Sequence, residues 1–140
     1  MKNMELLTQK TNIEGWSYTQ KRNLVNRVFR WCKKNMGVNR RHEFEVIPSI
    51  IKGYGEDEDV FGAYCPYENI IYIYHDRVET ISDLIGTTIH EYQHSLQPIK
   101  TKYHKMALKH GYWDNPLEVE ARKVEKKNLP KFLDYINKVG

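Results

Sequence analysis

The sequence predicts a single α+β domain in which helices enclose a small β-sheet. Three observations indicate this class: an apolar helical pattern near the N-terminus, a hairpin pattern between residues 60 and 74, and helical patterns after residue 79. The chain has 140 residues, 40% of them hydrophobic, which is enough for one domain with one core. No internal repeat divides the sequence, so residues 1–140 are expected to form that domain.

The N-terminal part is expected to consist of a loose leader followed by a helix. Residues 1–17 show no regular pattern, Gly15 interrupts them, and Trp16 is expected to anchor them to the core. The helix is expected to begin at about residues 17–19 and to end at Gly37, which suits a C-cap. Its apolar stripe consists of Leu24, Val25, Val28, Trp31 and Cys32.

The next two stretches predict β-structure. Residues 44–51 are rich in β-branched residues and predict a strand, with an interruption expected at Pro48. Residues 60–74 predict a β-hairpin, because Tyr64 precedes a Cys-Pro-Tyr-Glu-Asn turn and aliphatic and aromatic residues alternate after it. In the second strand of this hairpin, one face is expected to carry Ile71 and Ile73 and the other Tyr72 and Tyr74.

Residues 79–97 predict a helix with one apolar face. Ser82, or Thr80 in capping-box spacing with Asp83, can begin this helix, and Pro98 ends it. At 100° per residue, one side of the helix gathers Ile81, Leu84, Ile85, Ile89, Tyr92 and Leu96. That side is therefore expected to pack into the core.

The opposite side of the same helix carries a His-Glu-x-x-His motif. His90 and His94 are one turn apart on one face, so both imidazoles can bind one tetrahedral Zn²⁺. Glu91 follows the first ligand and can act as a general base for a zinc-bound water. Small residues such as Gly86 share this side and leave space beside the histidines. A surface helix with two outward histidines would show the same pattern, so the rest of the chain must decide.

The last third of the chain predicts a linker and two helices. Residues 99–113 are polar and are expected to be a linker containing at most a short helix. Asp114-Asn115-Pro116 predicts the start of a glutamate-bearing helix, with proline at its first position, and Pro130 is expected to end it. A separate terminal amphipathic helix is expected from Phe132, Leu133, Tyr135, Ile136 and Val139.

The order of hairpin, motif helix and downstream glutamate helix resembles the gluzincins, which are zinc metallopeptidases with a glutamate as third ligand. In that family the glutamate often lies in a Glu-x-x-Ala setting, which Glu118-Val119-Glu120-Ala121 matches here. The resemblance covers about residues 44–128 and is nearest to small bacterial and phage members. It implies a zincin-like fold, Zn²⁺ as cofactor, His90, His94 and Glu118 as ligands, and a peptide or protein substrate. It also implies that the strand Ile70–Tyr74 pairs with an extended substrate.

Several positions of this implied site stay open. Glu120 is a rival third ligand, and His104 or His110 would instead complete a three-histidine site. Many relatives carry aspartate four residues after the ligand, where this chain has Arg122, so the carboxylate that orients a motif histidine is unassigned. The candidates for that carboxylate are Asp83 and Glu125, and those for the group assisting the oxyanion are Tyr103, His104, His110 and Tyr112. A metzincin site is excluded, because Gln97 and Lys100 replace its glycine and third histidine.

Two other functions fit parts of the sequence. A structural or catalytically inert zinc module would use the same histidines and close the coordination with a fourth protein ligand, such as His104 or His110. A nucleic-acid-binding protein would use the basic residues within 19–41, although the net charge of +4 is modest and no nucleic-acid-binding motif is present. The sequence does not indicate an oligomeric state.

The protein is expected to reside in the cytoplasm. The N-terminus lacks a secretory pattern, and no stretch is long and apolar enough for a membrane helix. Two cysteines, Cys32 and Cys65, form neither a Cys-x-x-Cys pair nor a disulfide-rich pattern, which is typical of a reducing compartment.

Overall fold

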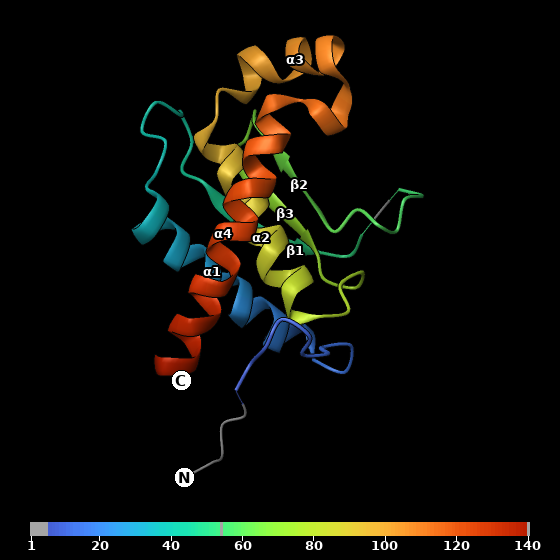
Figure 1. Ribbon diagram of the computed structural model, residues 1–140, viewed down its shortest axis with the longest axis vertical. Coiled ribbons are helices and arrows are strands. Elements are labelled where there is room, and N and C mark those ends of the chain that lie inside the picture. Colours follow the sequence, from blue (N-terminus) through green and yellow to red (C-terminus); the bar gives the residue numbers. More distant parts are fainter. Residues whose placement is uncertain (1–5, 54, 140) are drawn as a thin grey trace.

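The computed structural model describes residues 6–53 and 55–139. This part of the chain is α+β, with four helices and a three-stranded sheet (Figure 1). The elements in chain order are α1 (Tyr18–Met36), β1 (Ile47–Ile51), β2 (Gly62–Cys65), β3 (Ile70–Tyr74), α2 (Ile81–Leu96), α3 (Ile99–Asp114) and α4 (Pro116–Val139).

The sheet has the strand order β1-β3-β2. The predicted hairpin is confirmed, because β2 and β3 pair antiparallel, with Tyr64 opposite Ile71. β1 pairs parallel to the other edge of β3. The interruption expected at Pro48 was wrong: Pro48 lies within β1, which is an edge strand, and a proline is tolerated where its ring faces away from the ladder.

Helix α2 lies at the centre of the molecule and packs against α1, α4, β2 and β3, with α4 crossing over it in Figure 1. Its start is confirmed, because the Thr80 side chain caps the helix and forms a capping box with Asp83. The predicted apolar face is confirmed as well. Ile81, Leu84, Ile85, Ile89 and Tyr92 are completely buried, and Leu96 packs at the edge of the core. The motif helix is therefore fixed on one side by the core.

The described part of the predicted leader, residues 6–17, is not loose; residues 1–5 lie outside the described chain. Ile13 is completely buried in the core. Its backbone N–H donates to the Glu79 carbonyl at 2.9 Å, and the N–H of Ile81 donates to the Thr11 carbonyl at 2.8 Å. The segment is thus tied to the start of α2. The sequence did not reveal this, because one apolar residue among polar ones carries no periodic signal.

Residues 99–114 form the helix α3 instead of a linker. Lysine, methionine, alanine and leucine in this stretch are strong helix formers, although none of its residues is buried and no apolar stripe marks it. Gly111 adopts φ 81°, which breaks the regular helix and turns the chain towards α4. Local propensity, together with contacts to α4, accounts for this helix.

The end expected at Pro130 was also wrong, because α4 continues through Pro130 to Val139 as one helix. A proline inside a helix removes one backbone hydrogen bond. Here Pro130 and Lys126, whose carbonyl loses its partner, are both exposed, so water can satisfy that carbonyl. The core contacts that keep both halves in one line come from Leu129, Phe132, Leu133 and Ile136.

Within the described residues, no helix combines enough length with enough apolar content to cross a membrane.

Candidate metal centre

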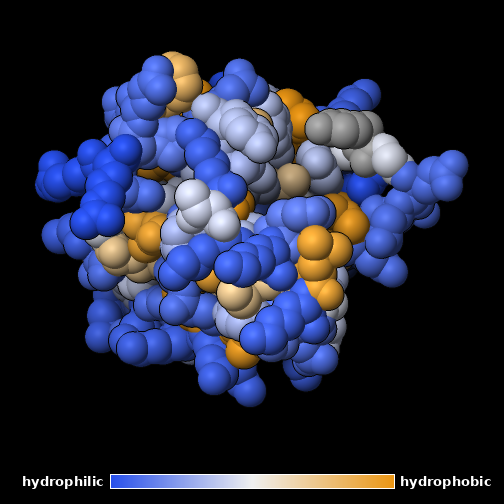
Figure 2. Space-filling view, turned by 90° about the horizontal axis from the view of Figure 1, so that it is seen from above, coloured by the Kyte–Doolittle hydropathy of each residue, from blue (hydrophilic) through white to orange (hydrophobic). Residues whose placement is uncertain are grey.

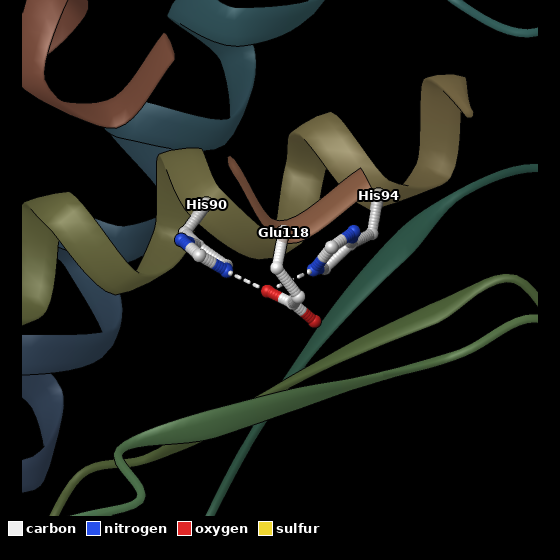
Figure 3. Close-up of side chains that lie close together, drawn as sticks. All are labelled: His90, His94 and Glu118. Carbon is white, nitrogen blue, oxygen red and sulfur yellow. Dashed lines mark hydrogen bonds and ion pairs between the residues drawn. The ribbon is translucent and has the colours of Figure 1, made fainter. Parts of the chain in front are cut away.

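Three side chains from two helices converge above the sheet. His90 and His94 lie one turn apart on α2, with ring centroids 5.0 Å apart. Glu118 comes from the first turn of α4 and points between them (Figure 3). The position of that turn is fixed by buried Asn115, whose side chain accepts a hydrogen bond from the N–H of Leu117 at 3.0 Å and donates to the Tyr103 carbonyl at 3.2 Å.

The spacing of the three donor atoms suits a metal ion. Glu118 Oε1 lies 2.9 Å from His90 Nε2 and 3.2 Å from His94 Nε2. All three donor atoms lie within 4.8 Å of one another, and no other such group of His, Cys, Asp and Glu occurs among the described residues. Ligands at about 2.0–2.1 Å from a tetrahedral metal are separated by about 3.3 Å, so small side-chain shifts would enclose an ion. The site can therefore hold a metal ion.

The outer nitrogens of both histidines are already occupied. His90 Nδ1–H donates to Glu125 Oε1 at 3.0 Å, and His94 Nδ1–H donates to Gln97 Oε1 at 2.6 Å. These bonds orient both rings so that Nε2 faces Glu118, which is the arrangement that metal-bound histidines need. Of the two carboxylates considered for this role, Glu125 contacts a motif histidine, whereas Asp83 caps α2.

The role of Gln97 as the hydrogen-bond partner of His94 was not predicted from the sequence. No feature of the motif marks this residue, and its only signal is its position three residues after His94, near the helix end.

Hydrogen bonds within the cluster stabilise the protonated form of the histidines and the ionised form of Glu118. Burial opposes protonation of His90, but its hydrogen bonds to Glu118 and Glu125 outweigh burial and raise its pKa to about 10. Burial likewise disfavours ionised Glu118, yet hydrogen bonds from His90 and His94 hold the pKa of Glu118 below its usual value. The carboxylate of Glu118 thus lies as an anion between two imidazoles whose pKa values are both raised by their hydrogen bonds to it.

Glu91 lines the same cavity as the three candidate ligands. The cavity has a volume of about 620 Å³ and lies between α2, β2 and the start of α4. Burial raises the pKa of the Glu91 carboxyl, while the nearby His94 and His90 lower it in part. An acid with a raised pKa beside a metal site is suited to accept and return a proton.

Two glycines allow the close packing around this cluster. A Cβ at Gly86 would lie 2.6 Å from Glu125 Oε2, so only glycine lets Glu125 approach His90 from that side. A Cβ at Gly62 in β2 would lie 2.6 Å from Thr87 Cγ2 and 2.5 Å from the Tyr72 carbonyl. The space expected beside the histidines is therefore filled by Glu125.

The remaining candidate residues separate into two groups. Tyr103 and Tyr112 line the cavity, and the Tyr103 hydroxyl donates a short hydrogen bond to Glu118 Oε2. His104 and His110 are exposed on α3 and do not line the cavity. Glu120, the rival ligand, accepts hydrogen bonds from Gln93 and Gln97 and stays outside the cluster.

No known family model matches the chain, and neither a curated protein nor a solved structure is significantly similar to it.

Proposed function

We propose that the protein is a zinc-dependent metallopeptidase of the gluzincin type, with a zincin-like fold. The observation that carries this proposal is the convergence of His90, His94 and Glu118 in a cavity that Glu91 also lines. Two histidines and one carboxylate, with a second carboxylate beside them, are the groups that catalytic zinc sites use in peptide hydrolysis.

Zinc, when bound by these three residues, would supply an acidified water and polarise the scissile carbonyl. Glu91 would accept the proton of that water and return it to the leaving amine. Its raised pKa makes this carboxyl a stronger base than an exposed glutamate, which favours the first of these two proton transfers. Glu125 and Gln97 would keep the two imidazoles in position throughout.

The tyrosines of the cavity have different proposed roles. Tyr103 is engaged with Glu118 and would orient that ligand. Tyr112 follows the break at Gly111 and makes no hydrogen bond to the cluster, so its hydroxyl is the one we assign to the carbonyl oxygen of the substrate. Partial burial raises the pKa of Tyr112, and its hydroxyl would act as the donor to that oxygen.

The substrate strand expected at Ile70–Tyr74 needs a correction. β3 is the central strand and pairs with a neighbour on both sides, so it has no free edge for a peptide. β2 lies at the edge of the sheet, and Gly62, Ala63 and Tyr64 of β2 line the cavity. We therefore propose β2 as the strand along which an extended peptide binds.

The test combines metal analysis with hydrolysis of a quenched fluorescent peptide library. The purified protein should contain about one zinc ion per chain, and a chelator should abolish hydrolysis until zinc is restored. Glu91→Gln should keep its zinc and lose about 10²- to 10⁴-fold in rate, because Gln cannot accept the proton.

Absence of zinc binding together with equal rates for the wild type and Glu91→Gln would refute the proposal. Tight zinc binding without any hydrolysis would favour the inert zinc module.

A further inference from the structure

A second cavity adjoins the candidate metal centre. Its volume is about 1030 Å³, and it lies between the segment after α1 and the first turn of α3. Tyr64, Pro66 and Ile99 line both cavities, so the two form neighbouring compartments at the carboxyl end of β2. A peptide extended along β2 would pass from one into the other.

The wall of the second cavity is strongly basic. It contains Arg40, Arg41, Lys100 and Lys102, against which Glu43 is the single acidic residue. None of these four cations forms an ion pair among the described residues; Lys100 instead lies over the Tyr67 ring, with Nζ 5.8 Å from the centroid. Four cations without acidic partners attract a negatively charged ligand.

The segment that carries Arg40 and Arg41 is held in place by side chains of α2. The Tyr92 hydroxyl donates to the Gly37 carbonyl at 2.5 Å, and Asn39 Nδ2 donates to the Ser95 carbonyl at 3.3 Å. His42 Nε2–H donates to the Pro66 carbonyl at 2.7 Å, which joins this segment to the turn after β2. The basic wall is thus fixed relative to the metal centre.

We infer that this cavity is a specificity subsite for acidic residues, and that the substrates are peptides with Asp or Glu near the scissile bond. The inference rests on the proposed peptidase function and adds the substrate class. The cavity combines its cations with apolar walls from Met36, Val38 and Leu96, which suit the stem of a Glu side chain.

A nucleic acid fits this region less well. The neighbouring metal cavity is lined by Asp57, Glu91 and Glu118, and a backbone with a charge on every nucleotide would meet these carboxylates. A peptide can place an acidic side chain in the basic cavity and uncharged residues beside the metal centre. Viewed from the end where α3 lies, the surface is mostly hydrophilic and its hydrophobic areas are separate (Figure 2). Polar and charged side chains thus make up most of the surface on this face.

The test uses zinc-loaded Glu91→Gln protein and fluorescent peptides that differ only in three Glu or three Gln residues. Fluorescence anisotropy should show about tenfold tighter binding of the Glu peptide at low salt, declining as salt increases. Arg40→Glu/Arg41→Glu should remove this preference. Lys126→Glu/Lys127→Glu changes the net charge equally on exposed α4 positions outside both cavities and should retain it.

Catalysis gives an independent readout in the active protein. The ratio of kcat/KM for Glu over Gln peptides should fall about tenfold in Arg40→Glu/Arg41→Glu and stay within about twofold in the Lys126/Lys127 control. If circular dichroism shows that Arg40→Glu/Arg41→Glu is misfolded, Lys102→Glu replaces it as the variant that removes positive charge from the cavity.

Hydrolysis with no preference for acidic residues would overturn this inference and leave the peptidase proposal intact. A wild type that hydrolyses nothing would overturn the peptidase proposal itself. Tighter binding of a single-stranded oligonucleotide than of the Glu peptide, lost in the same variant, would replace the acidic peptide with a nucleic acid.

Discussion

At the scale of single residues, two glutamates that are two positions apart have different surroundings. Glu118 is 4% exposed and lies between both motif histidines, whereas Glu120 is exposed and holds Gln93 and Gln97. The Glu-x-x-Ala setting in the sequence already favours Glu118. The contacts of Gln97 and the short Tyr103 bond could not be derived, because they depend on where α3 and α4 meet α2.

The first prediction separates these two glutamates by zinc affinity. Glu118→Gln should weaken zinc binding at least about 100-fold, because it removes the negative charge of the proposed third ligand. Glu120→Gln should weaken it less than about tenfold, since Glu120 reaches the site only through Gln97. Competition with a chromophoric chelator measures both affinities, and the reverse order would assign the ligand to Glu120.

A second prediction concerns the two thiols. Burial raises the pKa of Cys32 to about 12, so at pH 8 only about one molecule in ten thousand carries this thiolate. Cys65 lies partly exposed at the end of β2. Iodoacetamide should therefore modify Cys65 in the native protein and Cys32 only after unfolding, as mass spectrometry of the peptides would show. Rapid labelling of Cys32 in the native protein would mean that the buried side of α1 becomes exposed to solvent.

At the scale of elements, the packing of α4 against α2 depends on Gly86. Gly86→Ala should weaken zinc binding about tenfold or more, because the added Cβ displaces Glu125 from His90. The same substitution in a Glu125→Ala background should have little further effect on zinc affinity. Calorimetric titration of all four proteins with zinc tests this cycle, and additive losses would show that Gly86 acts independently of Glu125.

The ends of the elements show where local sequence signals suffice. As expected, Thr80 caps the start of α2 and Gly37 caps the end of α1. These caps are predictable because capping involves residues that are close in sequence. The helix end predicted at Pro130 was wrong because the proline is only a local signal. Contacts of Leu129 and Phe132 with distant residues keep the helix continuous. Tertiary packing decided this element, and the sequence alone does not display that packing.

At the scale of the whole molecule, the segment before α1 contacts both the core and the C-terminal part of α4. The Leu7 backbone N–H and carbonyl both bond to the Asn137 side chain at 2.8 Å, and Ile13 is completely buried. Pattern-based prediction found the class, the hairpin and the motif helix. It could not find this tie, because residues 130 positions apart share no local pattern.

The segment before α1 should contribute to the stability of the fold. Ile13→Ala should lower the free energy of unfolding by about 2–5 kcal/mol, because it leaves a cavity in the core. Leu6→Ala, at a side chain that is 72% exposed, should change it by less than about 0.5 kcal/mol. Urea unfolding at a fixed zinc concentration measures both values, and equal values would return this segment to the role of a loose leader.

Helix α3 contributes residues to both cavities and none to the buried core. Substitutions at its exposed positions should therefore disturb the core little. Under the proposed peptidase function, a laboratory library confined to its exposed positions should change which peptides are cut and leave the yield of folded protein nearly constant.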